Sequence, residues 1–174
     1  YYPTLGEVDA VSQSGWCVRL NNWHINQGAS AFEVEDGDTV TWLYTCQYGA
    51  DVGADFSNKS AEITGIVFAE NYGTLAPEFG KDVKEYKYTV AEDIKSIAME
   101  IKLDNYASVV TVKVDGNQVK YRPNKAIAVT SSSLVEISTA LEYMDAANNN
   151  QITVYTDNVK IQLAPPNKAP SVVT

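Results

Sequence analysis

Apolar and polar residues alternate along most of this chain, which is the pattern of strands with one buried face. The alternation is clear in residues 15–21 and again in residues 39–46, and a shorter stretch covers Ala31–Glu35. The turn-forming sequences Asn21-Asn22 and Asp36-Gly37-Asp38 separate these stretches. We therefore predict three strands that turn one apolar parity toward a core. The residues of that parity are Trp16, Val18, Leu20, Phe32, Val34, Val40, Trp42 and Tyr44.

Downstream of residue 60 the alternation continues in short segments with turns between them. Asp115-Gly116-Asn117 predicts a hairpin turn, and Gly73–Phe79 predicts a turn in which Pro77 restricts the backbone. Only Leu141–Ala147 offers a helical alternative. Short strands at this spacing predict a mainly β protein with an antiparallel β-sandwich. The predicted strands lie at residues 63–68, 85–90, 96–103, 107–114, 118–121, 126–129, 134–139 and 151–163.

A change in composition near residue 58 predicts a domain boundary. The 3 tryptophans, the 2 cysteines and the single histidine all lie within Gly15–Asp55, and the polar segment Ser57–Ser60 follows. Beyond it tryptophan disappears and lysine becomes frequent. We predict a small β unit over residues 1–57, a β-sandwich over residues 58–164, and a proline-rich linker over residues 165–174.

The charge of the chain limits its partners. The net charge is −9 over 174 residues, and residues 1–57 hold eight acidic residues against one basic residue, Arg19. Nucleic acids and anionic lipids need a basic surface, so the sequence argues against both as partners. No apolar run reaches the about 18–20 residues of a membrane helix, and membrane insertion is not expected.

Cys17 and Cys46 lie on strands that are predicted to be neighbours, and the sequence leaves two states open for them. A disulfide would close a loop of about 30 residues and add roughly 3–4 kcal/mol of stability. Two separate free thiols are the alternative, because cysteine also behaves as a small apolar residue. A cysteine nucleophile would need a base and an orienting group beside it. Apart from the lone His24, the sequence supplies no such set, so a cysteine-dependent hydrolase is the weakest hypothesis and we expect no enzyme.

Candidate ligand contacts lie in the predicted turn after residue 21 and in the acidic loop at residues 49–55. Aromatic rings in loops offer flat contact area to sugars, corrins or other planar ligands. The acidic pair has the oxygen ligands that calcium prefers, but its spacing is not that of an EF-hand, and one histidine does not make a metal site. We expect no metal. The candidate contact residues are Trp23, His24, Tyr48, Asp51 and Asp55.

A set of spaced motifs in residues 5–56 carries a resemblance to a known family. The motifs are Gly15-Trp16, Asn21, Gly28-Ala29-Ser30, Asp36-Gly37-Asp38, Trp42-x-Tyr44-Thr45-Cys46 and Gly49-x-Asp51-x-Gly53. They resemble the transcobalamin-like C-terminal domain family, DUF4430, which is common on the surface of Gram-positive gut bacteria. The resemblance implies a β-grasp-like unit and, as in transcobalamin and intrinsic factor, cobalamin as a ligand. Residues 1–14 cannot supply the earlier hairpin and helix of a full β-grasp unit, so we expect a truncated or partial one.

Residues 61–164 carry a second resemblance, whose motifs are structural and indicate no chemistry. They are Ile66-x-Phe68, Gly73-x-Leu75-x-Pro77-x-Phe79, Tyr86-x-Tyr88-x-Val90, Val112-x-Val114-Asp115-Gly116 and Asn150-Gln151-Ile152-Thr153-Val154. They resemble the cadherin-like β-sandwich domain of bacterial surface proteins, which has an Ig-like fold. Together the two resemblances imply a secreted or cell-surface location.

The sequence as a whole predicts a non-catalytic binding or adhesion module whose partner is a small molecule, a glycan or a surface protein. The alternative is capture of cobalamin or a related small molecule, which rests on the family resemblance alone. A partial β-grasp unit leaves sheet edges exposed, and exposed edges favour pairing with another chain. We therefore also expect a homodimer through residues 1–21 or 31–46.

Overall fold

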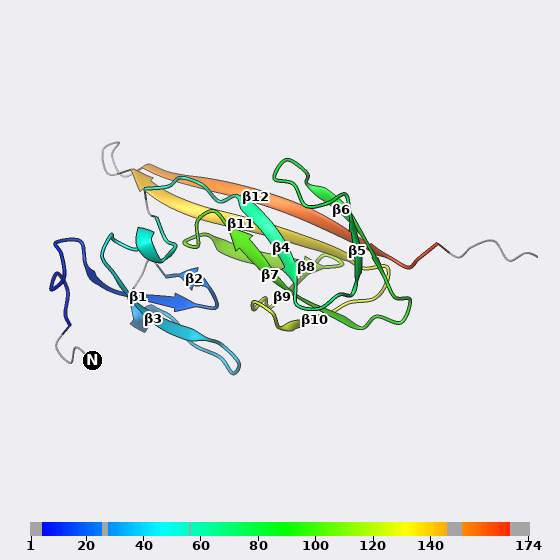
Figure 1. Ribbon diagram of the computed structural model, residues 1–174, viewed down its shortest axis with the longest axis horizontal. Helices are drawn as coiled ribbons and strands as arrows, with labels where there is room; N and C mark the ends of the chain where they lie inside the picture. Colours follow the sequence, from blue (N-terminus) through cyan, green and yellow to red (C-terminus); the bar gives the residue numbers. More distant parts are fainter. Residues whose placement is uncertain (1–4, 26–27, 56, 146–150, 168–174) are drawn as a thin grey trace, which may run out of the picture. The chain divides into compact units, whose positions relative to one another are not determined.

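The computed structural model describes residues 5–25, 28–55, 57–145 and 151–167, and it is mainly β (Figure 1). This confirms the predicted fold class. The first part of the chain contains the strands β1 (Gly15–Leu20), β2 (Trp23–His24) and β3 (Val40–Thr45), with the short 3₁₀ turns η1 (Ala29–Ala31) and η2 (Ala50–Val52). The remaining strands are β4 (Ile63–Phe68), β5 (Gly73–Ala76), β6 (Glu85–Val90), β7 (Ser96–Leu103), β8 (Val109–Val114), β9 (Asn117–Val119), β10 (Ala126–Ala128), β11 (Leu134–Asp145) and β12 (Gln151–Ala164).

The described chain divides into two compact units that are not continuous in sequence. Unit 1 consists of the described residues within Tyr1–Glu62, Leu103–Val110 and Thr139–Asp157. Unit 2 consists of those within Ile63–Lys102, Thr111–Ser138 and Asn158–Thr174. Segments 103–110 and 139–157, which the sequence assigned to the sandwich, therefore belong to the compact unit of the N-terminal residues. The predicted domain boundary at residue 58 remains a prediction.

Unit 2 contains the three-stranded sheet β10-β7-β4 and those parts of the sheet β5-β6-β12-β11-β8-β9 that lie outside residues 103–110 and 139–157. Alternate side chains of both sheets are buried, as a sandwich core requires. The left-handed turn of Asp115 (φ 51°) and Gly116 (φ 80°) joins β8 to β9 as predicted. Fully buried members of this core include Ile63, Ile97, Met99, Val112, Val135, Ile137, Ile161 and Leu163.

Unit 1 contains a three-stranded antiparallel sheet in the order β2-β1-β3. Asn21 (φ 50°) and Asn22 (φ 71°) form the tight turn between β1 and β2, because asparagine tolerates left-handed backbone. The register of β1 on β3 sets Cys17 opposite Leu43 and Val18 opposite Trp42. This sheet carries the candidate site.

Several predicted elements differ in the structure. The predicted strand over Ala31–Glu35 is wrong: η1 is followed by irregular chain, and Val34 is 61% exposed. Part of the predicted turn at Gly73–Phe79 is β5, which pairs with β6. The helical alternative at Leu141–Ala147 is also wrong, because β11 continues to Asp145. The predicted linker at 165–174 lies mostly outside the described residues, and so do residues 1–4.

Candidate functional site: the aromatic face and the Cys17 pocket of unit 1

In the β2-β1-β3 sheet, the face that the alternation predicted to be buried is the more exposed one. Trp16 is 48% exposed and Trp42 is 59% exposed, although both have the parity expected of a core. The opposite parity is the more buried one, since His24 is only 2% exposed and Thr45 is also buried. The prediction that Trp16 and Trp42 form the core is therefore wrong. We call the apolar side of the sheet, formed by Trp16, Val18, Leu20, Val40, Trp42 and Tyr44, the aromatic face.

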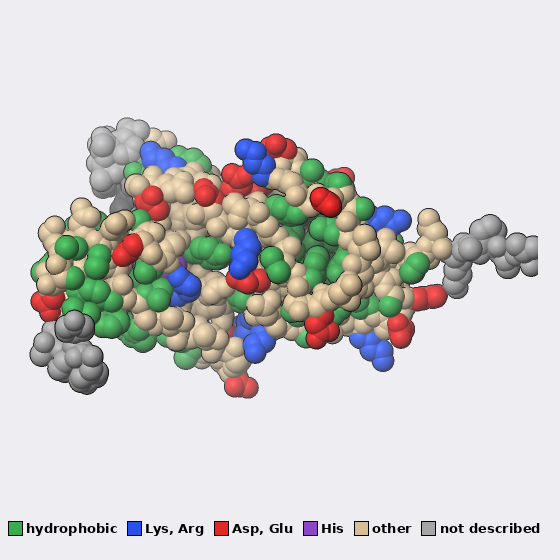
Figure 2. Space-filling view, in the orientation of Figure 1, with side chains coloured by type: hydrophobic (Ala, Val, Ile, Leu, Met, Phe, Trp, Pro, Cys, Tyr) green, Lys and Arg blue, Asp and Glu red, His purple; other side chains and the backbone are tan. Residues whose placement is uncertain are grey.

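Two rings of the aromatic face are held in place by their polar atoms. The indole Nε1 of Trp16 donates to the carbonyl of Leu5 at 2.9 Å, and its ring lies edge-on to Tyr44 with centroids 5.2 Å apart. The Tyr44 hydroxyl lies 2.9 Å from both the Gly6 carbonyl and Ser14 Oγ. A surface fixed in this way loses little conformational entropy when it binds a ligand. Figure 2 shows apolar side chains gathered over the region of β1 and β3.

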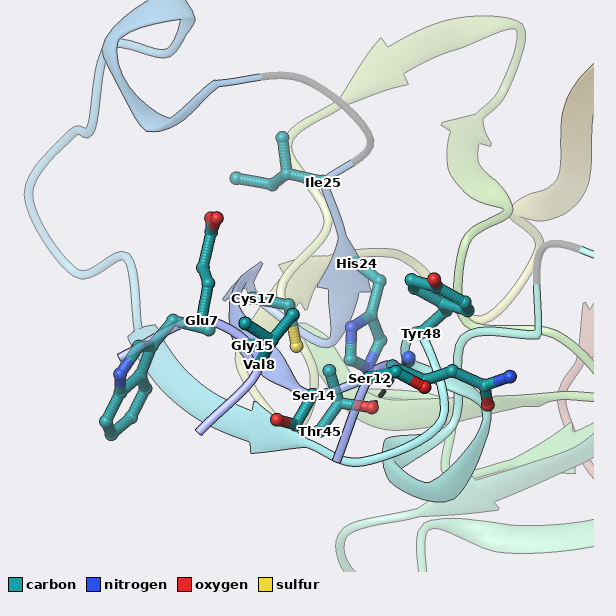
Figure 3. Close-up of a pocket in the computed structure, with 13 residues that line it drawn as sticks. Glu7, Val8, Ser12, Ser14, Gly15, Cys17, His24, Ile25, Thr45 and Tyr48 are labelled. Atoms are coloured by element: carbon teal, nitrogen blue, oxygen red, sulfur yellow. Dashed lines mark hydrogen bonds between the residues drawn. The ribbon is translucent and has the colours of Figure 1, made fainter. Parts of the chain in front are cut away.

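The buried side of the same sheet lines a pocket of about 460 Å³, which we call the Cys17 pocket (Figure 3). Its volume is within the range of pockets that bind small organic molecules. The Cys17 thiol and the His24 ring both face this space, with Ser14 and Thr45 below them. The lining residues are Glu7, Val8, Ser12, Gln13, Ser14, Gly15, Trp16, Cys17, His24, Ile25, Thr45, Tyr48 and Gly49.

Burial and the neighbouring Arg19 both disfavour the protonated form of His24. Arg19 Nε and Nη2 lie 3.2 and 3.0 Å from His24 Nε2, and Nη2 also donates to the Val52 carbonyl at 2.7 Å. The guanidinium only donates hydrogen bonds, whereas the Val52 carbonyl, 2.8 Å from the same Nε2, only accepts them, so the tautomer of the ring decides which of the two contacts Nε2 makes. Burial and the charge of Arg19 lower the pKa of His24, against a smaller opposite effect of the Val52 carbonyl. The ring is therefore neutral near pH 7.

The Cys17 thiol is neutral as well. Burial raises its pKa above the ordinary value, although Arg19 opposes this. Its Sγ lies 3.5 Å from the Leu43 carbonyl, to which it donates. A cysteine nucleophile needs a thiolate beside an imidazolium, and both pKa shifts oppose that charge pair.

The two cysteines are free thiols in this structure. Cys17 is opposite Leu43, whereas Cys46 lies just beyond the end of β3. Because the two positions differ by three residues in register, their side chains point to opposite faces of the sheet. The disulfide that the sequence allowed is not formed.

Thiol counting tests this arrangement. Denatured protein that has never met a reductant should give two equivalents of reactive thiol with Ellman's reagent. In native protein at pH 7, Cys17 should react slowly, because burial raises its pKa and leaves little thiolate. The Cys17→Ser variant should therefore lose the slow phase alone. Finding no free thiol in the unreduced sample would contradict the structure.

The five predicted contact residues are not brought together. His24 and Tyr48 line the Cys17 pocket, and Tyr48 is 67% exposed. Trp23 is half-buried, since its Nε1 donates to the Ala107 carbonyl at 3.1 Å and its ring packs edge-on against Phe32. His24 belongs to β2 and is buried, so the prediction that it lies in a turn is wrong.

The two predicted acidic contacts bind the backbone of their own loops. Asp51 accepts hydrogen bonds from the Thr45 hydroxyl and from the Cys46 amide at 2.8 Å, which lower its pKa. Asp55 accepts from the Ser57 amide and hydroxyl, and its pKa is lowered too. Among the described residues, no group of three or more His, Cys, Asp and Glu side chains is placed to hold a metal ion.

Sequence reasoning missed the exposure of Trp16 and Trp42, yet a signal for it exists. Strand 40–45 has no charged residue, and the first 60 residues contain no second apolar strand pair or amphipathic helix that would cover the face. Burial of Trp16 and Trp42 would require another element to cover this face, and the sequence of the first 60 residues shows none. The contact of Arg19 with the Val52 carbonyl had no such signal, because it joins residues 33 positions apart in the chain.

No protein-family model matches the chain, and neither a curated protein nor a solved structure gives a match. The resemblances to the transcobalamin-like and cadherin-like families therefore remain predictions. Within the described part of the chain, no helix has the length and hydropathy of a membrane span.

Proposed function

We propose that this chain is a non-catalytic binding module and that the aromatic face of unit 1 is its contact surface. The single observation that supports this most is the exposure of Trp16 and Trp42 on a sheet face with fixed rings. A soluble protein seldom leaves a contiguous apolar patch open unless something binds there. Tryptophan is also the residue that contributes most often to binding energy at contact surfaces.

The distribution of exposed apolar side chains supports unit 1 as the binding unit. Among the described residues, ten of the large exposed hydrophobic side chains lie in unit 1 and one, Val67, lies in unit 2. Those of unit 1 are Val8, Val11, Trp16, Val34, Val40, Trp42, Tyr48, Val109, Ile152 and Val154. Unit 2 in this proposal is a structural support. A cell-surface location and a role in adhesion follow from the family resemblance and belong to the same proposal.

A second candidate function is capture of a small molecule in the Cys17 pocket. Its support is the pocket volume of about 460 Å³ and the neutral His24 and Cys17 that face it. Cobalamin, which the resemblance implies, is one ligand to test here. The two candidate surfaces share Trp16, but Trp42 belongs to the aromatic face alone and Tyr48 to the pocket alone, so substitutions can separate them.

An array experiment tests the proposal and separates the two surfaces. The protein is screened on glycan and peptide arrays, and cobalamin is titrated in parallel with tryptophan emission as the readout. Trp42→Ala should weaken binding to any array ligand by about tenfold or more, because central aromatic contacts contribute about 1.5 kcal/mol or more. Tyr48→Ala is the matched control, since Tyr48 is 67% exposed against 59% for Trp42 but lies at the pocket and not on the aromatic face.

The possible results distinguish the aromatic face from the Cys17 pocket as the binding surface. Ligand loss with Trp42→Ala alone supports the aromatic face. Ligand loss with Tyr48→Ala alone, or cobalamin quenching at micromolar concentration, supports the pocket instead. If the arrays give no ligand that either variant affects, the binding-module proposal is wrong.

A further inference from the structure

Strand β3 is an edge strand with one side of its backbone unpaired in the described part of unit 1. The sheet order is β2-β1-β3, so among the described strands β3 pairs with β1 alone. The Asn21 amide donates to the Thr39 carbonyl at 3.0 Å, which makes this a hydrogen-bonded pair of the ladder. In antiparallel sheets such pairs alternate with non-bonded ones. Thr41 and Leu43 therefore bond to β1, and the amides and carbonyls of Val40, Trp42 and Tyr44 point away from it.

A second observation supports this assignment of the β3 backbone groups that point toward β1 and away from it. The Ile25 amide donates to the Val18 carbonyl at 3.1 Å, so Val18 directs its backbone toward β2 and not toward β3. Val18 is opposite Trp42, which is consequently a non-bonded pair. The backbone groups of Trp42 thus face the open edge, while its side chain lies on the exposed aromatic face.

The open edge has defined ends, and each carries a carboxylate. At one end the Cys46 amide is already bound by Asp51. At the other end Asp38 accepts from the Asn21 side chain at 2.8 Å and from the Glu35 amide at 2.8 Å. The open segment is therefore Val40–Tyr44, long enough for the few main-chain hydrogen bonds with which an added peptide strand binds.

Nothing in the sequence of β3 blocks such pairing. Edge strands are normally protected by a charged side chain, a proline or a bulge. The strand VTWLYT contains no charged residue or proline, and its ladder to β1 runs without interruption from Val40 to Thr45. An open edge beside an exposed aromatic face offers both backbone hydrogen bonds and an apolar surface for alternate side chains.

The charge of unit 1 selects the occupant. Its sequence segments contain thirteen acidic residues and two basic ones, a balance of −11, whereas those of unit 2 have a balance of +2. An antiparallel second copy of β3 would set Asp38 of one chain near the Cys46 end, and hence Asp51, of the other. Like charges at both ends oppose that dimer. A partner strand with a basic residue at each end would instead place a positive charge near Asp38 and another near Asp51.

We propose that unit 1 binds an extended peptide segment of a partner protein by strand addition to Val40–Tyr44, and that this segment has alternating apolar residues between basic ends. The proposal rests on the proposed function and names its ligand class. The peptide backbone pairs with the open edge, and its apolar side chains extend the aromatic face beside Trp42. Lys or Arg at its ends meets Asp38 and Asp51.

Synthetic peptides provide the test. The probe is Lys-Arg-Val-Thr-Val-Thr-Val-Arg-Lys, labelled at one end and titrated by fluorescence anisotropy. Two controls keep the same centre: one has Glu at all four basic positions, and one has N-methyl groups on alternate central amides. The unmodified basic peptide should bind, and both controls should bind at least about tenfold more weakly, because each loses either the charge contacts or two to three hydrogen bonds. Raising the salt concentration should weaken the basic peptide alone.

Protein variants locate the peptide on β3. Val40→Pro removes an amide that points outward and keeps the ladder to β1, and proline is tolerated at such edge positions. It should reduce peptide affinity about tenfold or more, whereas Val40→Thr, which keeps the amide, should not. Unchanged thermal unfolding and circular dichroism of Val40→Pro verify its fold. If that variant does not fold, the N-methylated peptide still decides the question.

The outcomes separate this inference from the proposed function. Equal binding of the N-methylated peptide, or of the Glu peptide, overturns strand addition by a basic segment. If only glycans bind and Trp42→Ala abolishes them, the aromatic face is functional and the peptide inference is wrong. If the protein alone dimerises in sizing experiments and Val40→Pro makes it monomeric, the occupant is a second copy and the inference is again wrong.

Discussion

Replacing Asn105 by alanine is expected to lower the free energy of unfolding by about 3–5 kcal/mol. Asn105 is 0% exposed and has three hydrogen bonds to backbone groups of unit 1. Its Nδ2 donates to the carbonyls of Asp55 at 2.7 Å and Asn58 at 2.9 Å, and its Oδ1 accepts from the Ala107 amide at 3.0 Å. Alanine removes all three hydrogen bonds, and a buried polar group that is left unpaired costs about 1–3 kcal/mol. The Ala107 amide is buried and the two carbonyls are partly buried, so the summed loss lies below three times the upper value.

Chemical denaturation followed by tryptophan fluorescence measures this effect, since all 3 tryptophans lie in unit 1. Asn58→Ala is the matched control. The Asn58 side chain donates only to the exposed Asp104 carboxylate, and alanine keeps the Asn58 carbonyl that Asn105 uses. The control should change stability by less than about 1 kcal/mol. Similar losses for both variants would show that Asn105 does not join the segments of unit 1.

Acidification below pH 6.5 is expected to destabilise unit 1 through His24. Its pKa is lower in the folded protein than the ordinary value of 6.5, because burial and the Arg19 charge disfavour the imidazolium. The unfolded chain therefore binds the proton more readily than the folded one, and stability rises with pH. The contribution is complete above about pH 6.5 and is lost as the pH falls from there toward the folded pKa. The slope for this one group cannot exceed about 1.4 kcal/mol per pH unit.

Denaturant unfolding at a series of pH values between 4.5 and 8 measures this dependence. His24→Gln keeps a hydrogen-bonding side chain beside Arg19 and should flatten the profile over that range. Asp51 and Asp55 also have lowered pKa values, so their contribution changes with pH in the same direction as that of His24. Their stabilisation is lost only at more acid pH, below the ordinary carboxyl pKa of 3.8, as the carboxylates protonate. A wild-type profile that stays flat between pH 5 and pH 7 would contradict the buried contact of His24 with Arg19.

Local features of this fold followed from the sequence because short-range chemistry decides them. The turns at Asn21-Asn22 and Asp115-Gly116 need left-handed backbone, which Asn, Asp and Gly adopt most easily. The alternation in strands such as β6 and β7 of unit 2 also predicted their buried side chains, including Tyr86, Tyr88 and Ile97. There one face of each strand meets a second sheet, so the apolar parity and the buried parity coincide.

The sequence by itself determined that β1 and β3 each have an apolar parity, but only the tertiary structure decided whether that parity is buried. Alternation fixes which side chains share a face, whereas burial requires another element to cover it. In unit 1 the polar parity is the covered one: Arg19, His24 and Val52 meet there through contacts that span up to 33 residues. Trp16 and Trp42 are left exposed on the other face. No spacing rule relates such distant residues, so the exposed aromatic face and the open edge of β3 became visible only in the folded chain.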